Sequence, residues 1–306
     1  MTPLSQTILQ SYQIRKTKTQ KLAFIELLKS HFPQLTIQSG GFPKCRNIII
    51  GDIEKAEIIL SAHYDTCAQL PFPNFIAPKN PLLSIGYSIL ITLPVIAAAF
   101  LFNCILNIIG CNYWLNCCYS LIAWLVLLLM FFTGPANKHT ANDNTSGVSV
   151  LCELLGTLDQ TTQSKVAFVF FDHEESGLIG ASFFRKKFKS QLKNKLLINF
   201  DCVSDGDYIL VIANKQARIQ FGQKLKNAFL PTADKNILFS SAEKTFYPSD
   251  QAVFPVSVAI AALKRKRFIG YYLDRIHTHK DTEFDKRNIK LICDSILRLL
   301  KQISLD

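Results

Sequence analysis

The most notable absence in this 306-residue sequence is of charge. No acidic, basic or histidine residue lies between Lys79 and Lys138, and charged residues make up 19% of the chain, a low share for a soluble protein. Two apolar runs, 82–109 and 113–132, fill this block, and each exceeds the length of about 20 residues that crosses a bilayer as a helix. The sequence predicts a transmembrane hairpin with a tight turn at 110–112; a buried hairpin in a soluble core is the alternative.

A two-span hairpin returns the chain to the side of the membrane that it left. The segments before Lys79 and after Lys138 would therefore share one compartment. No signal peptide opens the sequence. Lysines flank the outer ends of the block, which favours the cytoplasm for that compartment. The prediction is an integral membrane protein with two spans and both flanking segments in the cytoplasm.

Other missing patterns exclude further classes. The nine cysteines are odd in number and none has CxxC spacing, which argues against a disulfide framework and favours reduced thiols. Zinc-finger spacing, interleaved aromatic and basic residues, repeats and a phosphate-binding glycine loop are all absent. The net charge of +11 is spread along the chain. It is attributed to solvated faces and, as an alternative, to an anionic membrane surface, so no nucleic-acid partner is expected.

Outside the apolar block, strands alternate with helices, which predicts an α/β fold with a mixed sheet covered on both faces. Residues 1–33 show apolar residues at helical spacing and predict an amphipathic helix packed on the protein body, with a position on lipid as the alternative. Apolar runs rich in Val, Ile and Phe predict strands at 47–50, 56–61, 166–171, 196–200, 208–212 and 256–262. Helical periodicity predicts helices at 144–158, 178–192, 217–229 and 286–303.

Polar side chains follow several of the predicted strands. In open α/β sheets, ligands bind beyond the carboxyl ends of the strands, so these residues are expected on one rim. Clustered carboxylates repel each other unless a cation lies among them, and His with Asp or Glu suits zinc. The sequence thus predicts a metal site. The candidate groups are SAHYDT (61–66), ANDN (141–144), DHEE (172–175), DCVSD (201–205) and RIHTHKDT (275–282).

Each of these residues taken alone has a plainer explanation. An Asp before a helix, such as Asp143, is most often an N-cap. The Glu174–Glu175 pair would suit the solvated start of a helix. A lone histidine is more often structural than a metal ligand. Only their joint occurrence at several strand ends favours a metal centre.

Six motifs together resemble the M28 family of zinc aminopeptidases. They are SAHYDT, NDNTSGV, FVFFDHEESGLIGASFF, NFD, SDQAVF and IHTHKDT, in that order along the chain. The resemblance covers about residues 45–66 and 136–303. It departs from the family in the apolar hairpin inserted between His63 and Asp143, and in Ala181, where the family commonly has serine.

The resemblance implies a zinc site with two ions, and it implies a role for each matching residue. His63 and Asp201 would bind one zinc ion, Glu175 and His277 the other, and Asp143 both. Glu174 would be the general base, and Asp65 would orient His63. Tyr247 and Asp250 would contact substrate, and for Tyr247 support of an oxyanion and structural packing remain equally open. His279 lies off the family's ligand position, which favours a supporting or solvent role, and His173 has no assigned role.

The predicted function is a membrane-anchored zinc exopeptidase, most consistent with an aminopeptidase that takes peptide substrates. One alternative is an acyltransferase similar to glutaminyl cyclases, with one zinc ion. Another is a non-catalytic membrane scaffold with a vestigial site. The predicted organisation is a peptidase domain in two parts, 1–80 and 136–306, separated by the hairpin at 81–135.

Overall fold

The computed structural model describes residues 1–110 and 112–303, and omits the side chains at 95 and 126–133. One mixed sheet forms its centre, with the strand order β1-β2-β4-β3-β5-β8-β6-β7 and β9 paired with β8. Its strands are β1 Thr36–Gly40, β2 Cys45–Ile50, β3 Ile58–His63, β4 Val166–Phe171, β5 Leu196–Phe200, β6 Tyr208–Ala213, β7 Asn236–Ser241, β8 Ser257–Lys266 and β9 Gly270–Tyr272.

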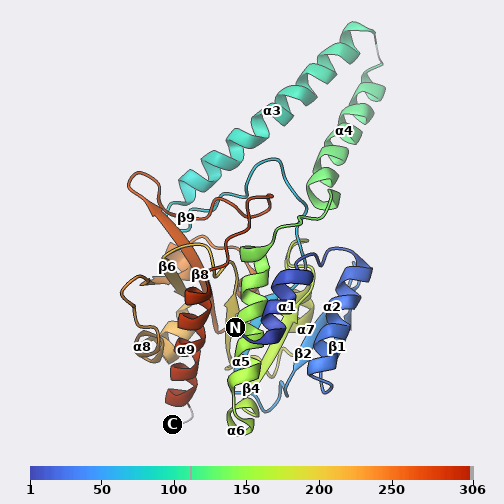
Figure 1. Ribbon diagram of the computed structural model, residues 1–306. Coiled ribbons are helices and arrows are strands. Elements are labelled where there is room, and N and C mark those ends of the chain that lie inside the picture. The colour runs from blue at the N-terminus through green and yellow to red at the C-terminus, as the bar shows by residue number, and fades with distance from the viewer. Residues whose placement is uncertain (111, 304–306) are drawn as a thin grey trace.

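Helices cover both faces of this sheet (Figure 1). They are α1 Pro3–Ser11, α2 Lys18–His31, α5 Gly147–Thr157, α6 Gln160–Gln163, α7 Ile179–Lys187, α8 Lys215–Ala228 and α9 Lys286–Ile303. The largest apolar core joins one face of the sheet to α1, α2, α5, α8 and α9. A second core joins the other face to α7 through Ala181 and Phe184. The predicted mixed α/β fold is therefore confirmed.

The central strands β3, β4, β5 and β8 run parallel to their neighbours in this group. Every residue of β3, β4 and β5 is buried, as expected of parallel strands with helices on both faces. Because they run the same way, their carboxyl ends meet at one edge of the sheet. This edge receives the polar residues that follow each strand in the sequence.

The predicted single helix over 1–33 is wrong, because the segment forms two helices with a break between them. In the break, the Arg15 guanidinium is fully buried and donates to the carbonyls of Tyr12 and Tyr64. Thr17 then begins α2 with a capping box completed by Gln20. The prediction that this segment packs on the body is confirmed, since Ile8 and Phe24 lie in the main core.

The charge-free block forms two helices, α3 Pro81–Ile108 and α4 Tyr113–Thr133, which project away from the sheet (Figure 1). Asn116 on α4 donates to the side chains of Asn103 and Asn107 on α3. Among the described residues, α3 alone is identified as long and apolar enough to cross a membrane, and only 6% of its most apolar stretch is buried. The turn predicted at 110–112 includes position 111, which lies outside the described residues.

Candidate metal centre

Five acidic and imidazole side chains meet at the carboxyl edge of the parallel strands. His63 is the last residue of β3, Asp201 directly follows β5, and Glu175 lies in the loop after β4. Asp143 lies in the segment Ala141–Ser146 that precedes α5, and His277 lies in the loop after β9. The loops therefore bring together all five residues that the sequence predicts as metal ligands.

The Asp143 carboxylate lies between the two imidazoles. Its Oδ1 is 3.2 Å from Nε2 of His63, and its Oδ2 is 3.2 Å from Nε2 of His277. The Asp281 carboxylate fixes this loop by accepting the backbone N–H groups of Asn142 and Asp143 at 2.8 and 2.9 Å. Asp143 thus presents one oxygen to each half of the site, and it makes no N-cap hydrogen bond to α5.

The first half of the site is built around His63. Its Nε2 is 3.7 Å from Oδ1 of Asp201, while its Nδ1 faces Oδ1 of Asp65 at 3.6 Å. Asp65 also accepts the backbone N–H groups of Glu174 and Glu175 at 3.0 and 3.3 Å. One carboxylate therefore supports the imidazole from behind and holds the adjacent glutamates in place.

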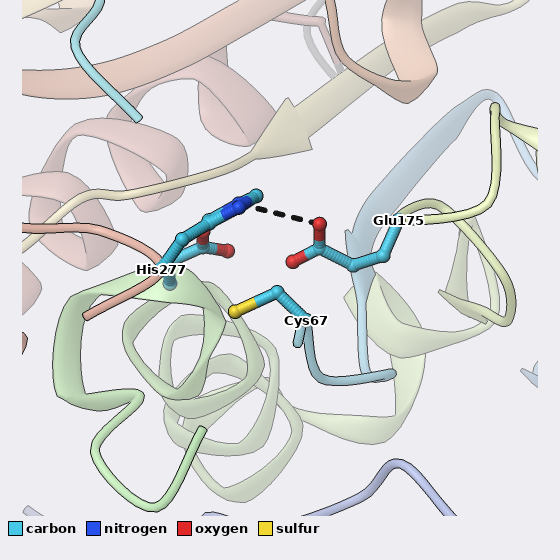
Figure 2. Close-up of side chains that lie close together, drawn as sticks. Cys67, Glu175 and His277 are labelled. Carbon is cyan, nitrogen blue, oxygen red and sulfur yellow. Dashed lines mark ion pairs between the residues drawn. The ribbon is translucent and has the colours of Figure 1, made fainter. Parts of the chain in front are cut away.

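The second half of the site joins Glu175 and His277. Glu175 Oε2 is 3.3 Å from Nε2 of His277. Figure 2 shows the Cys67 sulfur beside this pair. Potential ligand atoms of Cys67, Asp143, Glu175 and His277 all lie within 4.8 Å of one another. The sequence-based prediction assigned no role to Cys67, although its place two residues after Asp65 puts it at the same strand end.

The charges of the cluster favour a cation at its centre. Burial raises the pKa of Glu175 to about 7 and raises the pKa of Glu174 well above its usual value. Burial alone would lower the pKa of His277, but the carboxylates of Glu175 and Asp143 outweigh it and raise this pKa to about 9. Carboxylates that hold protons beside protonated imidazoles indicate an excess of negative charge.

The donor atoms also fit a divalent metal ion. Oε1 of Glu175 is buried and makes no hydrogen bond, and an unpaired buried carboxylate oxygen is costly. Imidazole nitrogen and carboxylate oxygen are typical ligands of zinc, which is usually four-coordinate. The residues present therefore fit the metal that the sequence pattern predicts.

The remaining predicted residues lie around this centre. Tyr247 is buried, and its hydroxyl donates to the backbone carbonyl of Asp201 at 3.0 Å. Asp250 is fully buried, and both of its carboxylate oxygens lack a hydrogen-bond partner. Burial raises the pKa of Asp250 well above its usual value. His279 is exposed, and Nδ1 of His173 lies 3.3 Å from the hydroxyl of Ser176.

A cavity of about 450 Å³ opens beside the cluster. Glu175, His277 and Cys67 line one part of it. Leu70, Phe72, Pro73 and Ile91 give it an apolar wall, and Lys16 and Lys21 also line it. Ile91 belongs to α3, so the base of the long apolar helix forms part of this cavity.

Comparison with known protein families and structures gives consistent results. The model of peptidase family M28 matches residues 129–300. Glutaminyl cyclase from Porphyromonas gingivalis has a similar structure, with 16% identity, coverage of 98% of this chain and 97% of that one, and a TM-score of 0.59. A Zn-dependent exopeptidase from Parabacteroides distasonis is 14% identical, with coverage of 97% and 94% and a TM-score of 0.56.

The LapA aminopeptidase of Legionella pneumophila is 14% identical, with coverage of 99% of this chain and 68% of that one and a TM-score of 0.57. At such identities the likeness shows a shared fold. A comparison with curated proteins finds no match.

Proposed function

The chain belongs to peptidase family M28 and is a metallopeptidase, and on this premise we propose that it is a membrane-anchored zinc aminopeptidase with two metal ions. One observation carries the proposal. The Asp143 carboxylate contacts His63 with one oxygen and His277 with the other. A carboxylate so placed is suited to bridge two ions.

The ligands divide into two sets that share Asp143. His63 and Asp201 would hold the first ion, and Glu175 and His277 the second. Ligand atoms of His63, Asp143 and Asp201 lie within 4.8 Å of one another, as do those of the second set. When bound, zinc supplies Lewis acidity toward a carbonyl and lowers the pKa of water.

Proton transfer falls to Glu174. Its carboxyl group lies beside His63, and its backbone is held by Asp65. As general base it would take a proton from the attacking water, and as general acid it would return that proton to the leaving amine. The adjacent glutamates thus have separate roles, with Glu174 moving the proton and Glu175 binding metal.

The peptide would enter through the cavity beside the second set of ligands. Its apolar wall suits a hydrophobic side chain next to the scissile bond. The Asp250 carboxylate, buried without a hydrogen-bond partner, remains the predicted contact for a polar group of the substrate. Tyr247 would act by positioning Asp201, since its hydroxyl is occupied by that residue's carbonyl.

Glutaminyl-cyclase-like acyl transfer is the second candidate. It is supported by the similarity to the Porphyromonas gingivalis enzyme over nearly the full length of both chains. A cyclase would use one zinc ion and would act on an N-terminal glutamine. A vestigial, non-catalytic site is less consistent with the molecule, because a scaffold has no physical need for a proton-transfer group beside five metal ligands.

The membrane anchor is part of the same proposal. The apolar surface of α3 is exposed, which favours lipid over a soluble core as its surroundings. With α4 as a second span, the peptidase parts at 1–80 and 136–306 would both face the cytoplasm and the segment 81–135 would form the hairpin. Reporter fusions at Cys111 and at the C-terminus should then report opposite sides of the membrane. If both reporters lie on the same side, the two-span arrangement is wrong.

A metal analysis and a substrate panel test the catalytic proposal. The detergent-purified protein should bind about two zinc ions per chain and release N-terminal residues from peptides with a free amine. N-acetylated versions of the same peptides should stay intact, and the Glu174→Gln variant is the matched negative control. Full activity in a metal-free preparation would contradict the mechanism. Cyclisation of glutamine peptides with one bound zinc would favour the cyclase.

A further inference from the structure

We propose that the Cys67 thiolate is a fourth protein ligand of the second metal ion, beside Asp143, Glu175 and His277. The inference rests on the two-metal site proposed above. It concerns a residue that lies outside the ligand set implied by the M28 resemblance. It would make the second site a sulfur, nitrogen and oxygen site, while the first site keeps nitrogen and oxygen ligands only.

The geometry of the four side chains carries the inference. Ligands at the usual zinc distances lie roughly 3.3–3.8 Å apart around a tetrahedral ion. The His277 nitrogen is already 3.2 Å from Asp143 and 3.3 Å from Glu175. The sulfur belongs to the same group, in which all ligand atoms lie within 4.8 Å. In Figure 2 it lies below the space between the Glu175 carboxylate and the His277 ring.

The surroundings of the sulfur differ from those of a packing cysteine. Cys67 is 2% exposed. A buried free cysteine usually behaves as a small apolar residue among other apolar residues, whereas Cys67 faces two carboxylates and an imidazole. The buried Oε1 of Glu175, which has no hydrogen-bond partner, independently indicates that a ligand belongs in this space.

The backbone fixes the cysteine in this position. Its carbonyl accepts the N–H of Asn137 at 3.1 Å, and the next residue forms an isolated bridge with Ala136. These contacts tie the segment after β3 to the chain that leads from α4 into the Asp143 loop. Backbone contacts therefore fix the segment that carries the sulfur.

A thiolate changes what the second ion can do. Thiolate ligands favour zinc over magnesium, calcium or manganese. Cys67 would raise the number of protein ligands available to the second ion from three to four, whereas His63, Asp143 and Asp201 would supply three to the first. With four protein ligands, the second ion would be held more tightly than the first.

Cobalt substitution tests the inference without relying on activity. The metal-free, detergent-purified protein is loaded with two equivalents of Co²⁺, and the absorption spectrum is recorded. The wild type should show a near-ultraviolet sulfur-to-cobalt charge-transfer band. Cys67→Ser should lose it and bind the second ion at least about 10-fold more weakly. Cys45→Ser, which alters another buried cysteine on β2, is the matched control and should keep both.

A second variant guards against misfolding. Cys67→Asp replaces sulfur with an oxygen ligand, so it should lose the charge-transfer band yet keep two bound ions. Three outcomes would overturn the inference. The wild type could bind two cobalt ions without showing the band, the band could survive in Cys67→Ser, or the protein could fail to bind cobalt at all. If the wild type shows the charge-transfer band but has no peptidase activity, the proposed function is wrong. If it has peptidase activity and binds two ions but shows no band, only the role of Cys67 is wrong.

Discussion

At the scale of single residues, Glu174 offers the most direct test of the proton-transfer step. Glu174→Gln keeps the size of the side chain and removes its basicity. We expect about two zinc ions to remain bound, and kcat to fall by about 10² or more. Metal content by elemental analysis and steady-state kinetics on a free-amine peptide measure the two effects.

Two controls make this result specific. Glu175→Gln should lower the zinc content, because it removes a proposed ligand. Glu26→Gln, at an exposed position on α2, should change neither quantity. Unchanged turnover in Glu174→Gln would assign the proton transfer to another group.

The pH dependence of the metal-free protein follows from the same cluster. Burial raises the pKa of Glu175 from 4.5 to about 7. The nearby carboxylates overcome burial and raise the pKa of His277 from 6.5 to about 9. Both groups bind protons more tightly in the folded chain, so their contribution to stability is lost as pH rises, between about 4.5 and 7 for Glu175 and between about 6.5 and 9 for His277.

Thermal unfolding measures this dependence. The Tm of the metal-free protein should fall from pH 5 to pH 9, because Glu175 and His277 both bind protons more tightly in the folded chain than in the unfolded chain. Zinc requires deprotonated ligands, so the zinc-loaded protein should gain stability relative to the metal-free protein over the same range. A metal-free Tm that rises across this range would contradict the assigned pKa directions.

Substitution of Tyr247 tests whether this residue positions Asp201 or supports an oxyanion. Its hydroxyl donates to the Asp201 carbonyl, so Tyr247→Phe should destabilise the protein by about 1 kcal/mol. We expect kcat to change less than about 10-fold, because the hydroxyl is already occupied. A loss of about 10²–10³ in kcat with unchanged stability would instead indicate oxyanion support. Denaturant unfolding and kinetics on one preparation distinguish the two results.

Much of the site could be predicted at this scale. The shared edge of the parallel strands predicts that His63, Glu175 and Asp201 lie together, and the resemblance to the M28 family adds Asp143 and His277. His63, Asp143, Glu175, Asp201 and His277 all lie together there, though their roles remain predictions. No sequence pattern predicts that Asp281 accepts the N–H groups of the Asp143 loop, or that Cys67 faces His277. Those contacts depend on the conformations of the loops after β3 and β9 and of the segment before α5, and hydrophobic periodicity does not predict loop conformation.

At the scale of secondary-structure elements, α3 lines the cavity beside the metal-ligand cluster through Ile91. Ile91→Ala should remove part of the apolar wall and weaken binding of peptides with large hydrophobic N-terminal residues. We expect KM for a leucyl peptide to rise by about 10-fold, with kcat and the KM for an alanyl peptide nearly unchanged. Ile89→Ala, at an exposed position of the same helix, is the matched control. Equal effects of both substitutions would show that Ile91 has no specific role in binding the N-terminal side chain of the peptide.

The elements that periodicity missed have physical explanations. The strand β7 lies at the edge of the sheet and is only partly buried, so its sequence carries no clean alternation. The strand β9 has three residues, too few for a pattern. The break at 12–17 depends on Arg15 reaching the carbonyl of Tyr64, a contact 49 residues away along the chain.

At the scale of the whole molecule, the cavity and the hairpin lie at the same end. Figure 1 shows α3 and α4 projecting from one side of the sheet, and the base of α3 lines the cavity. If these helices cross a membrane, the cavity opens close to its surface. A substrate held on that surface would then meet the site at a raised local concentration.

Reconstitution into vesicles tests this geometry. A peptide with a free N-terminus and an acyl chain at its C-terminus should be cleaved with a kcat/KM at least about 10² higher than that of the same peptide without the chain, because both enzyme and substrate are confined to one surface. Lengthening a flexible spacer between peptide and acyl chain should reduce the advantage, since the effective concentration falls with length. Equal kcat/KM for both peptides in vesicles, with full metal content, would show that the anchor does not direct substrate choice and that soluble peptides reach the site as readily.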